Sequence, residues 1–580
     1  MAGYTVIRPV HEWPKAYLVE PKLMPGQESR QPTCYTVAVG TADGKPLKDG
    51  LAAGDALPQN TALALALHTV PTVEDATDLQ KAAVVGILPR RRRQSPAETS
   101  MVIGGPGTGK SQTIKILCAQ ARRHIAEVGN FICLAQTANV ARSMPQGRCG
   151  RRDIPPITVD MFIRAENKYI FPGLSGSKQP KLLVIIDEYS MVTSSQLDTL
   201  LEKARRVFKN VQLVLFGDHH QLPPVGGMSP WLSKHLRAAM ASTQASALAV
   251  YELRQQKRFR HDRVEVLVHA LLNRRFSTAN AMLFEAAARS GLPAKGTCPY
   301  FAYRNAELIE WNSKSHERLA ALPGANETTF RTAKGDPAPS FKLVNGTEVT
   351  CKENTFTKDE KLGIVYSEFN GLTGKVIGLT GGIQVIHETT TIKLRLENGD
   401  LHLMSPKMMP LGRVRSLQAK FTTPSNSSDG AESAPPPAKK RRRDDSNSMV
   451  WWFNIHQGPA KTIHLIQGLT LPRGQKVVIN VKGLSGSLGY YMLYVAASRV
   501  QQFADLYIIG YEKIMDLKSM ALACRCGCSG RSKAERRKLS SIEHSEAKLT
   551  WLHRWEETLL ARRRVIYEVS PAAQPDTDVL

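Results

Sequence analysis

The clearest candidate for chemistry is the eight-residue stretch Gly104-Gly105-Pro106-Gly107-Thr108-Gly109-Lys110-Ser111. Its glycines allow the backbone to curl around an anion, so that successive amide N–H groups point inward. Lys110 supplies an ammonium for the β- and γ-phosphates of a nucleotide, and Ser111 supplies a hydroxyl ligand for Mg²⁺. The flanking residues predict a strand over 99–103 and a helix over 112–121, whose positive end adds to the anion site. The stretch therefore predicts binding of ATP with Mg²⁺.

Acidic and amide side chains follow two further apolar stretches. Asp187 and Glu188 come directly after a predicted strand over 181–186, and Gln221 follows a predicted strand over 211–216. The carboxyl ends of parallel strands meet at one edge of a sheet, so we expect these side chains beside the phosphate loop. There Asp187 can bind Mg²⁺, Glu188 can act as general base on the attacking water, and Gln221 can reach the γ-phosphate or that water.

The composition points to a polyanionic partner. The chain has 580 residues and a formal net charge of +26, which predicts several domains and contact with nucleic acid. No run of about 18 apolar residues is present, so we expect no membrane-spanning segment. Nine cysteines in so long a chain do not make a disulfide framework, and no apolar signal core opens the sequence. We therefore expect an intracellular protein with reduced thiols.

Two stretches of the chain alternate between apolar strands and helices, which predicts two α/β units with parallel sheets covered on both faces. The strands are predicted at 99–103, 131–135, 181–186 and 211–216 in the first unit, and at 300–303, 477–481 and 506–509 in the second. Between them, 342–404 alternates apolar and polar residues, which predicts a small β-barrel. Hairpin turns are predicted there at Asn345-Gly346, Asn370-Gly371, Gly381-Gly382 and Asn398-Gly399.

These motifs, in this order, resemble those of superfamily 1 helicases, most of all the RecD/Pif group, over about residues 75–512. The matching segments are Gln80, 104–111, 134–141, 158–162, 187–192, 217–225, 258–260, 303–305 with Asn312, 369–376, 462–471 and 494–500. The resemblance implies two RecA-like P-loop domains with a small β-barrel insertion in the second. It also implies an ATP-dependent DNA helicase that moves 5′ to 3′ on single-stranded DNA as a monomer, in replication, repair or recombination.

The resemblance assigns roles to residues that spacing alone does not. Arg260 and Arg499 are expected to face the γ-phosphate, with Arg499 as an arginine finger. Thr137, Phe162 and His464 are expected to contact the nucleic-acid strand. The residues expected to bind the nucleotide are Gln80, which would read adenine, Gly104, Gly105, Pro106, Gly107, Thr108, Gly109, Lys110, Ser111, Gln112, Gln467 and Gly468.

Two other functions remain open. His219-His220 stand where RecD/Pif proteins often have aromatic residues, and a histidine there resembles the Upf group, so an RNA helicase is one alternative. A nucleic-acid-binding scaffold that has lost its motor is the other. We expect intact chemistry, because Lys110, Asp187, Glu188, Gln221 and Arg499 are all present.

The expected domains follow from these boundaries. They are 1–60 of unknown role, 61–257 as the first motor domain, 258–341 and 449–512 as the second, 342–424 as the barrel, 425–448 as a disordered linker, and 513–580 as a basic helical extension. The cluster from Lys439 to Arg443 predicts nuclear import. The thiols at Cys524, Cys526 and Cys528 have no clear fourth ligand, which argues against zinc. Asp78 is a candidate N-cap for the helix that carries Gln80.

Overall fold

The computed structural model describes residues 76–88, 97–419, 448–511 and 516–522, together with the backbone of three short strands before residue 40. Gaps within these ranges are 173, 175–178, 219, 225–226, 243, 245–246, 256, 260–261, 336, 360–362, 369, 397–398 and 469–470. The 425–447 part of the predicted linker, with its basic cluster, lies outside the described residues. So do Arg260 and the cysteines at 524, 526 and 528.

Contacts divide the chain into two compact parts, 1–70 with 394–402, and 71–393 with 403–580. In the smaller part, β1 (Tyr4–Pro9), β2 (Ala16–Pro21) and β3 (Thr36–Val39) form an antiparallel sheet. The larger part holds all the predicted chemistry. Among the described residues, no helix combines the length and the apolar character needed to cross a membrane.

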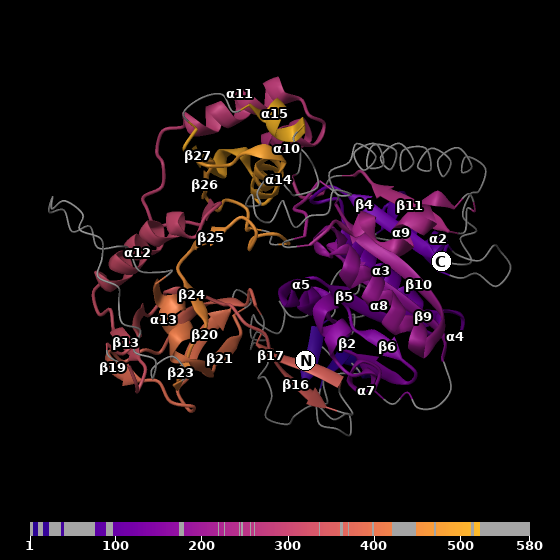
Figure 1. The fold of residues 1–580 in the computed structure, drawn as a ribbon, viewed down its shortest axis with the longest axis horizontal. Helices are drawn as coiled ribbons and strands as arrows, with labels where there is room; N and C mark the ends of the chain where they lie inside the picture. Colours follow the sequence, from indigo (N-terminus) through magenta and orange to yellow (C-terminus); the bar gives the residue numbers. More distant parts are fainter. Residues whose placement is uncertain are drawn as a thin grey trace, which may run out of the picture. The chain divides into compact units, whose positions relative to one another are not determined.

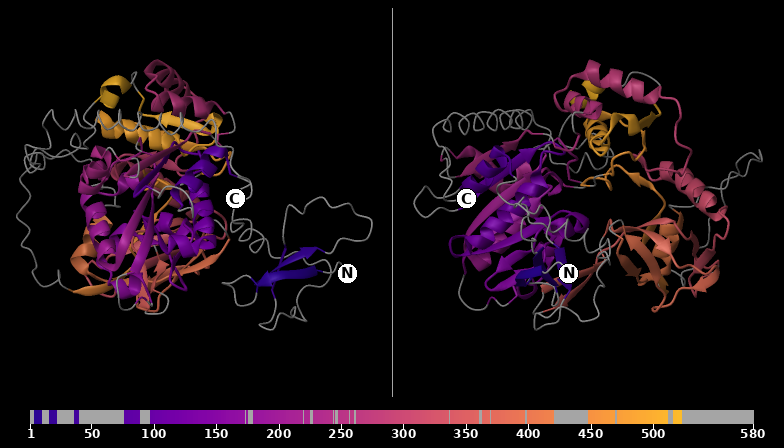
Figure 2. Two further views of the ribbon diagram at one scale, coloured as in Figure 1. Left: turned by 90° about the vertical axis from the view of Figure 1, so that its right-hand side faces the viewer. Right: turned by 180° about the vertical axis from the view of Figure 1, so that it is seen from behind.

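The first α/β unit, residues 76–253, surrounds a sheet with the order β11-β4-β10-β9-β5-β6-β7 (Figure 1, Figure 2). Its strands are β4 (Thr99–Gly104), β5 (Asn130–Ala135), β6 (Gly147–Cys149), β7 (Arg152–Ile154), β8 (Ile157–Thr158), β9 (Gln179–Asp187), β10 (Phe208–Gly217) and β11 (Leu248–Leu253). Its helices are α2 (Asp78–Ile87), α3 (Lys110–Arg123), α4 (Ile125–Val128), α5 (Ala138–Ser143), α6 (Val159–Arg164), α7 (Asn167–Ile170), α8 (Ser194–Val207) and α9 (Lys234–Ala241).

Successive residues of β4 pack in different cores, which explains why Met101, Val102 and Ile103 are all apolar. Met101 and Ile103 pack with residues of α6, α8 and α9, whereas Val102 packs with residues of α2 and α3. Side chains alternate between the faces of a strand, so a strand covered on both faces needs apolar residues throughout. The neighbouring strands β11, β10, β9 and β5 are mutually parallel along this sheet. The predicted parallel sheet of the first unit is confirmed.

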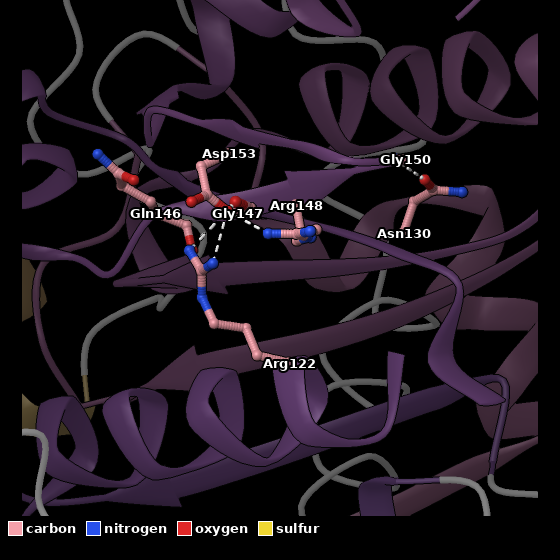
Figure 3. Close-up of polar contacts among 7 residues, drawn as sticks. All are labelled: Arg122, Asn130, Gln146, Gly147, Arg148, Gly150 and Asp153. Carbon is pink, nitrogen blue, oxygen red and sulfur yellow. Dashed lines mark hydrogen bonds and ion pairs between the residues drawn. The ribbon is translucent and has the colours of Figure 1, made fainter. Parts of the chain in front are cut away.

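An antiparallel hairpin extends this sheet beyond β5. β6 pairs with β5 and β7 pairs with β6. Figure 3 shows Arg122 of α3 reaching this hairpin, where its guanidinium contacts Asp153 Oδ1 at 2.5 Å and the carbonyl of Gln146 at 3.0 Å. Because the ion pair is partly exposed, it contributes little stability and serves to fix the hairpin beside the sheet edge.

The predicted N-cap of α2 is wrong by one residue. Thr77, not Asp78, precedes the helix in extended conformation, and its hydroxyl accepts a hydrogen bond from the backbone N–H of Gln80. The side chain of Gln80 in turn accepts from the N–H of Thr77, which completes a capping box. Asp78 occupies the first helical turn, where its charge favours the positive helix end.

The second α/β unit contains residues 263–320 and 460–522 and has a parallel sheet with the order β25-β12-β26-β27. Its strands are β12 (Tyr300–Ala302), β25 (Ala460–Thr462), β26 (Val477–Asn480) and β27 (Leu506–Ile509). Its helices are α10 (Arg263–Leu272), α11 (Phe276–Ala287), α12 (Ala306–Ala320), α14 (Gly486–Ala497) and α15 (Leu517–Leu522). Val477 and Ile479 pack on one face of the sheet and Val478 on the other. The predicted α/β class with two parallel sheets is therefore confirmed.

Short strands in small sheets fill the stretch between β13 and β24. They are β13 (Glu327–Arg331), β14 (Ser340–Val344), β15 (Glu348–Cys351), β16 (Thr355–Asp359), β17 (Gly363–Glu368), β18 (Thr373–Ile377), β19 (Gly382–Val385), β20 (Ile392–Leu396), β21 (Leu401–Met404), β22 (Lys407–Pro410), β23 (Met449–Trp452) and β24 (Ile455–Gln457), with the helix α13 (Leu411–Ala419).

Only one of the four predicted hairpin turns joins paired strands. Asn398 lies outside the described residues, and Gly399 lies between β20 and β21, which are neighbours in one sheet. The turn at Asn345-Gly346 instead joins β14, which pairs with β13, to β15, which pairs with β18 and β24. The turns at 370–371 and 381–382 likewise connect strands of different sheets. A glycine with positive φ suits any sharp reversal, so the residue pair alone did not decide which strands pair.

The hairpin of β16 and β17 reaches the first α/β unit. Ile364 of β17 is 1% exposed and belongs to the same core as Ile170 and Phe171. Phe356 of β16 packs against that core. This arm therefore binds the insertion to the first α/β unit through apolar burial.

Candidate nucleotide site

The phosphate loop between β4 and α3 has the geometry of an anion cradle. Gly107 and Gly109 have φ values of 80° and 90°, which residues with a Cβ rarely adopt. Lys110 is buried, and its Nζ donates to the carbonyls of Gly104 at 2.7 Å and Gly105 at 3.0 Å. The ammonium is thus held inside the loop, where the phosphates of a nucleotide would lie.

Gln80 braces the phosphate loop from α2. Its Nε2 donates to the carbonyl of Gly109 at 3.0 Å, and its Oε1 accepts from the N–H of Thr77 at 2.9 Å. A Cβ at Gly109 would lie 2.5 Å from Gln80 Nε2, so a larger residue at 109 would displace the Gln80 amide. The reading of adenine by Gln80 stays a prediction.

The other loop residues differ in exposure. Pro106 and Thr108 are buried, and the Thr108 hydroxyl donates to the carbonyl of Gly105 at 2.8 Å. Ser111 is exposed and Gln112 half-buried in the first turn of α3. The Ser111 hydroxyl is therefore available as a ligand.

Asp187 and Glu188 lie at the carboxyl end of β9. Asp187 is buried, and its Oδ1 accepts from the N–H of Glu188 at 2.8 Å. Burial, and then the neighbouring charge of Glu188, raise the pKa of Asp187 to about 7, whereas Lys110 opposes the rise. A carboxylate in this position is stabilised by a nearby cation. With the exposed hydroxyl of Ser111, this donor set fits Mg²⁺.

Glu188 and Gln221 each carry a buried side-chain oxygen. Glu188 is a non-glycine residue with a φ of 51°, a strained conformation of the kind found at functional sites. Within the described structure, Glu188 Oε2 and Gln221 Oε1 are buried and have no hydrogen-bond partner. Such orphaned acceptors are costly, so a water or ligand is expected to satisfy them.

Two arginines from outside the first α/β unit lie near these groups. Arg499, just after α14, is 2% exposed, and its Nε donates to the carbonyl of Val495 at 3.1 Å. Burial lowers its pKa, while the charge of Glu188 acts in the opposite direction. Arg258 donates to the carbonyl of Ser498 at 3.2 Å. Burial and the charge of Arg499 lower the pKa of Arg258 to about 10.

Arg258 is the functional candidate that sequence reasoning missed. The N–H of Lys257 donates to the carbonyl of Gly107 at 2.9 Å, which brings the segment after β11 onto the phosphate loop. Arg258 therefore lies between that loop and the end of α14. The sequence motif contained both arginines and we expected Arg260, which lies outside the described residues. Phe259 separates the two arginines and is fully buried. An apolar residue at this position was the available signal in the sequence that the arginines on either side of it have different surroundings.

The three residues predicted to contact a nucleic-acid strand differ in their surroundings. Phe162 is completely buried, and its ring packs edge-on against Phe171 with centroids 5.9 Å apart. A side chain in the core cannot stack on a base, so this prediction is wrong. Thr137 is half-buried as the N-cap of α5, and its hydroxyl accepts from the N–H of Val140 at 3.3 Å. His464 is half-buried, and burial lowers its pKa.

Gly468 lies against α5, and the described structure records no contact of Gln467 or Gly468 with the phosphate loop. A Cβ at Gly468 would lie 2.9 Å from Val140 Cγ2. Gln467 is buried, and within the described structure neither atom of its amide group has a hydrogen-bond partner. The segment after β25 therefore faces the segment after β5, which carries Thr137.

The chain is similar to known proteins over part or most of its length. A protein-family model described as an AAA domain matches residues 76–289. A search of curated proteins finds no match. Among solved structures, the chain is similar to Pif1 helicase from Candida albicans, with 17% identity, a TM-score of 0.46, and 78% of this chain and 97% of that chain covered. It is also similar to Pif1 helicase from Bacteroides in complex with ADP-AlF3 and ssDNA, with 20% identity, a TM-score of 0.47, and 77% and 94% covered.

The family match covers the half of the site that holds the phosphates. It includes the phosphate loop together with Asp187, Glu188 and Gln221. Residues 76–289 are thus similar to an AAA domain, and the matched range contains the nucleotide-site residues described above.

Proposed function

We propose that this protein is an ATP-dependent DNA helicase that moves along single-stranded DNA and separates duplexes. One observation carries the proposal: Arg258 and Arg499, which are 241 positions apart (499 − 258 = 241), lie together beside Glu188 and the phosphate loop. A site completed from distant parts of the chain can couple hydrolysis to relative motion of those parts.

Each residue has a defined task in ATP hydrolysis. The N–H groups of the phosphate loop and Lys110 bind the β- and γ-phosphates, while Ser111 and Asp187 would hold Mg²⁺. The ion would neutralise charge on the phosphate oxygens. Glu188 Oε2 accepts the proton of the attacking water, and Gln221 orients that water. The guanidinium groups of Arg258 and Arg499 stabilise the negative charge that spreads over the transferring phosphoryl group.

The same groups explain how hydrolysis would drive movement. The arginines gain most from a γ-phosphate, so its loss weakens the attraction that closes the site. Thr137 follows β5 in the first α/β unit, and His464 follows β25 in the second. A strand that contacts both residues would be advanced as the two units separate and close. The net charge of +26 supports a sequence-independent grip on phosphates.

We propose the 5′ to 3′ direction, a role in replication, repair or recombination, and a nuclear location from the motif resemblance and the basic cluster at 439–443. Strand separation on DNA and RNA duplexes with either a 5′ or a 3′ tail tests substrate and direction together. The expected result is ATP-dependent separation of the 5′-tailed DNA duplex. Separation of RNA only would favour the Upf-type alternative, and binding without ATP turnover would favour a scaffold.

A further inference from the structure

A buried hydrogen bond joins the turn before Gln221 to α14, the helix that Arg499 follows. The hydroxyl of Tyr494 in α14 donates to Asp218 Oδ2 at 2.7 Å. Tyr494 is 1% exposed and Asp218 is 2% exposed. The two residues belong to different α/β units, so this bond exists only while the units are together.

Asp218 is the partner of this hydrogen bond in the first unit. It follows β10 directly, and its Oδ1 accepts from the N–H of His220 at 2.9 Å. Its carbonyl accepts from the N–H of Gln221 at 3.1 Å. Asp218 therefore sets the conformation of the short turn that presents Gln221.

Tyr494 is the partner of this hydrogen bond in the second unit. Its carbonyl accepts from the N–H of Ser498 at 3.0 Å, and the carbonyl of Ser498 accepts from Arg258 at 3.2 Å. Arg499 is tied to the same helical turn, because its Nη2 donates to Ser498 Oγ at 3.0 Å. The contacts form a continuous series from Asp218 through Tyr494 and Ser498 to both arginines.

A phenylalanine at position 494 would supply the same apolar ring, so packing alone does not need the hydroxyl. Burial, and then the charge of Asp218, raise the pKa of Tyr494 well above its ordinary value, so the group remains a donor. A hydrogen bond to a buried carboxylate is stronger than one between neutral groups. The hydroxyl therefore stabilises the contact between the two α/β units beyond what packing of the ring provides.

We propose that Tyr494 is a positioning residue that couples the Gln221 turn to Arg258 and Arg499. When the two units meet, Gln221 reaches the position that orients the attacking water at the same time as the arginines reach the position that stabilises the transferring phosphoryl group. This inference rests on the proposed ATPase function. It assigns Tyr494 no contact with the nucleotide; it acts through Asp218 on one side and through Ser498 on the other.

The test compares two tyrosine variants of the full chain. Tyr494→Phe removes the hydroxyl between the units. Tyr490→Phe is a matched control, because Tyr490 lies one turn earlier in α14 and its hydroxyl donates to the carbonyl of Leu271 inside the second unit. ATP turnover with single-stranded DNA and the affinities for ADP and for ADP–aluminium fluoride, a transition-state analogue, are measured for both.

For Tyr494→Phe we expect kcat to fall about tenfold or more with little change in KM, and affinity for ADP–aluminium fluoride to fall by a similar factor while ADP affinity is kept. Tyr490→Phe should retain kcat and both affinities. Equal losses in the two variants, or wild-type behaviour of Tyr494→Phe, would overturn the inference alone. Absence of turnover in the wild-type protein would refute the proposed function and this inference together.

Discussion

The two α/β units contribute different groups to one nucleotide site. The first unit supplies a phosphate loop, with the ammonium of Lys110, and the carboxyl groups of Asp187 and Glu188. Glu188 Oε2 is buried and has no hydrogen-bond partner in the described structure, which points to a water there. The second unit supplies Arg499, and Arg258 lies at the junction between the two. Binding of the phosphates and stabilisation of the transferring group are thus assigned to different parts of the chain. This division makes hydrolysis sensitive to the relative position of the units.

Removing the first unit's ammonium should have the largest effect. Lys110→Ala deletes the positive charge held by the carbonyls of Gly104 and Gly105. We expect ATP turnover to fall by at least about 1,000-fold, because the β- and γ-phosphates lose their main cationic contact. Single-stranded DNA binding without nucleotide should be retained, as measured by fluorescence anisotropy. Unchanged turnover in this variant would remove the phosphate loop from the mechanism.

Replacing Glu188, the proposed general base, distinguishes the binding of ATP from its hydrolysis. Glu188→Gln keeps the size of the side chain but cannot accept a proton from water. We expect kcat to fall between about 100-fold and 10,000-fold, with ATP affinity preserved. Pre-steady-state hydrolysis and equilibrium binding of ATP measure the two effects. A matching loss of affinity would mean that Glu188 holds the nucleotide instead.

Substitution of the two candidate arginines tests the junction between the units. Arg258→Ala should lower kcat about 100-fold, because Arg258 lies between the phosphate loop and α14. Arg260→Ala, measured in the same assay, tests the prediction that the motif alone suggested. A large loss for Arg260→Ala with none for Arg258→Ala would reverse the assignment made from the geometry.

A smaller effect is expected from a buried cation of the insertion, away from the site. Burial, and then the charge of Lys461, lower the pKa of Lys352 to about 8. The unfolded chain keeps this proton up to its ordinary pKa near 10.5, so stability should rise with pH between about 8 and 10.5. The gain is at most about 2 kcal/mol, since the side chain is not fully buried.

Lys352→Met should therefore raise the melting temperature at pH 7 and flatten the pH dependence above pH 8. Thermal unfolding at several pH values, with the exposed Lys375→Met as control, measures this. A melting profile that keeps its slope in Lys352→Met would assign the pH dependence to other groups. The comparison of the two variants shows whether a buried cation in the insertion, away from the nucleotide site, lowers the stability of the protein.

Local patterns predicted what each segment does on its own. The glycine-rich loop, the strand and helix that flank it, and the acidic pair after β9 follow from apolar runs and backbone chemistry within about ten residues. Asp78 was a near miss, since both residues suit a cap and only the backbone conformation selected Thr77. Phe162 was misjudged because an aromatic residue in a motif looks the same whether it faces a base or a core.

Contacts between distant segments were beyond the sequence. Nothing in the spacing connects Asp218 with Tyr494, which are 276 positions apart (494 − 218 = 276) and form a 2.7 Å hydrogen bond. The choice between Arg258 and Arg260 depends on an irregular segment after β11, where no periodicity indicates which side chain faces the site. The arm formed by β16 and β17 likewise places Ile364 in a core whose other members are more than a hundred residues earlier.

The affinity of Arg499→Ala for ADP–aluminium fluoride relative to ADP, measured by calorimetry with single-stranded DNA present, tests the shared site most directly. We predict that the wild-type protein binds the analogue at least about 100-fold more tightly than ADP, and that Arg499→Ala loses this preference while keeping its affinity for ADP. If the variant retains the wild-type preference, Arg499 does not complete the nucleotide site and the two units do not share it.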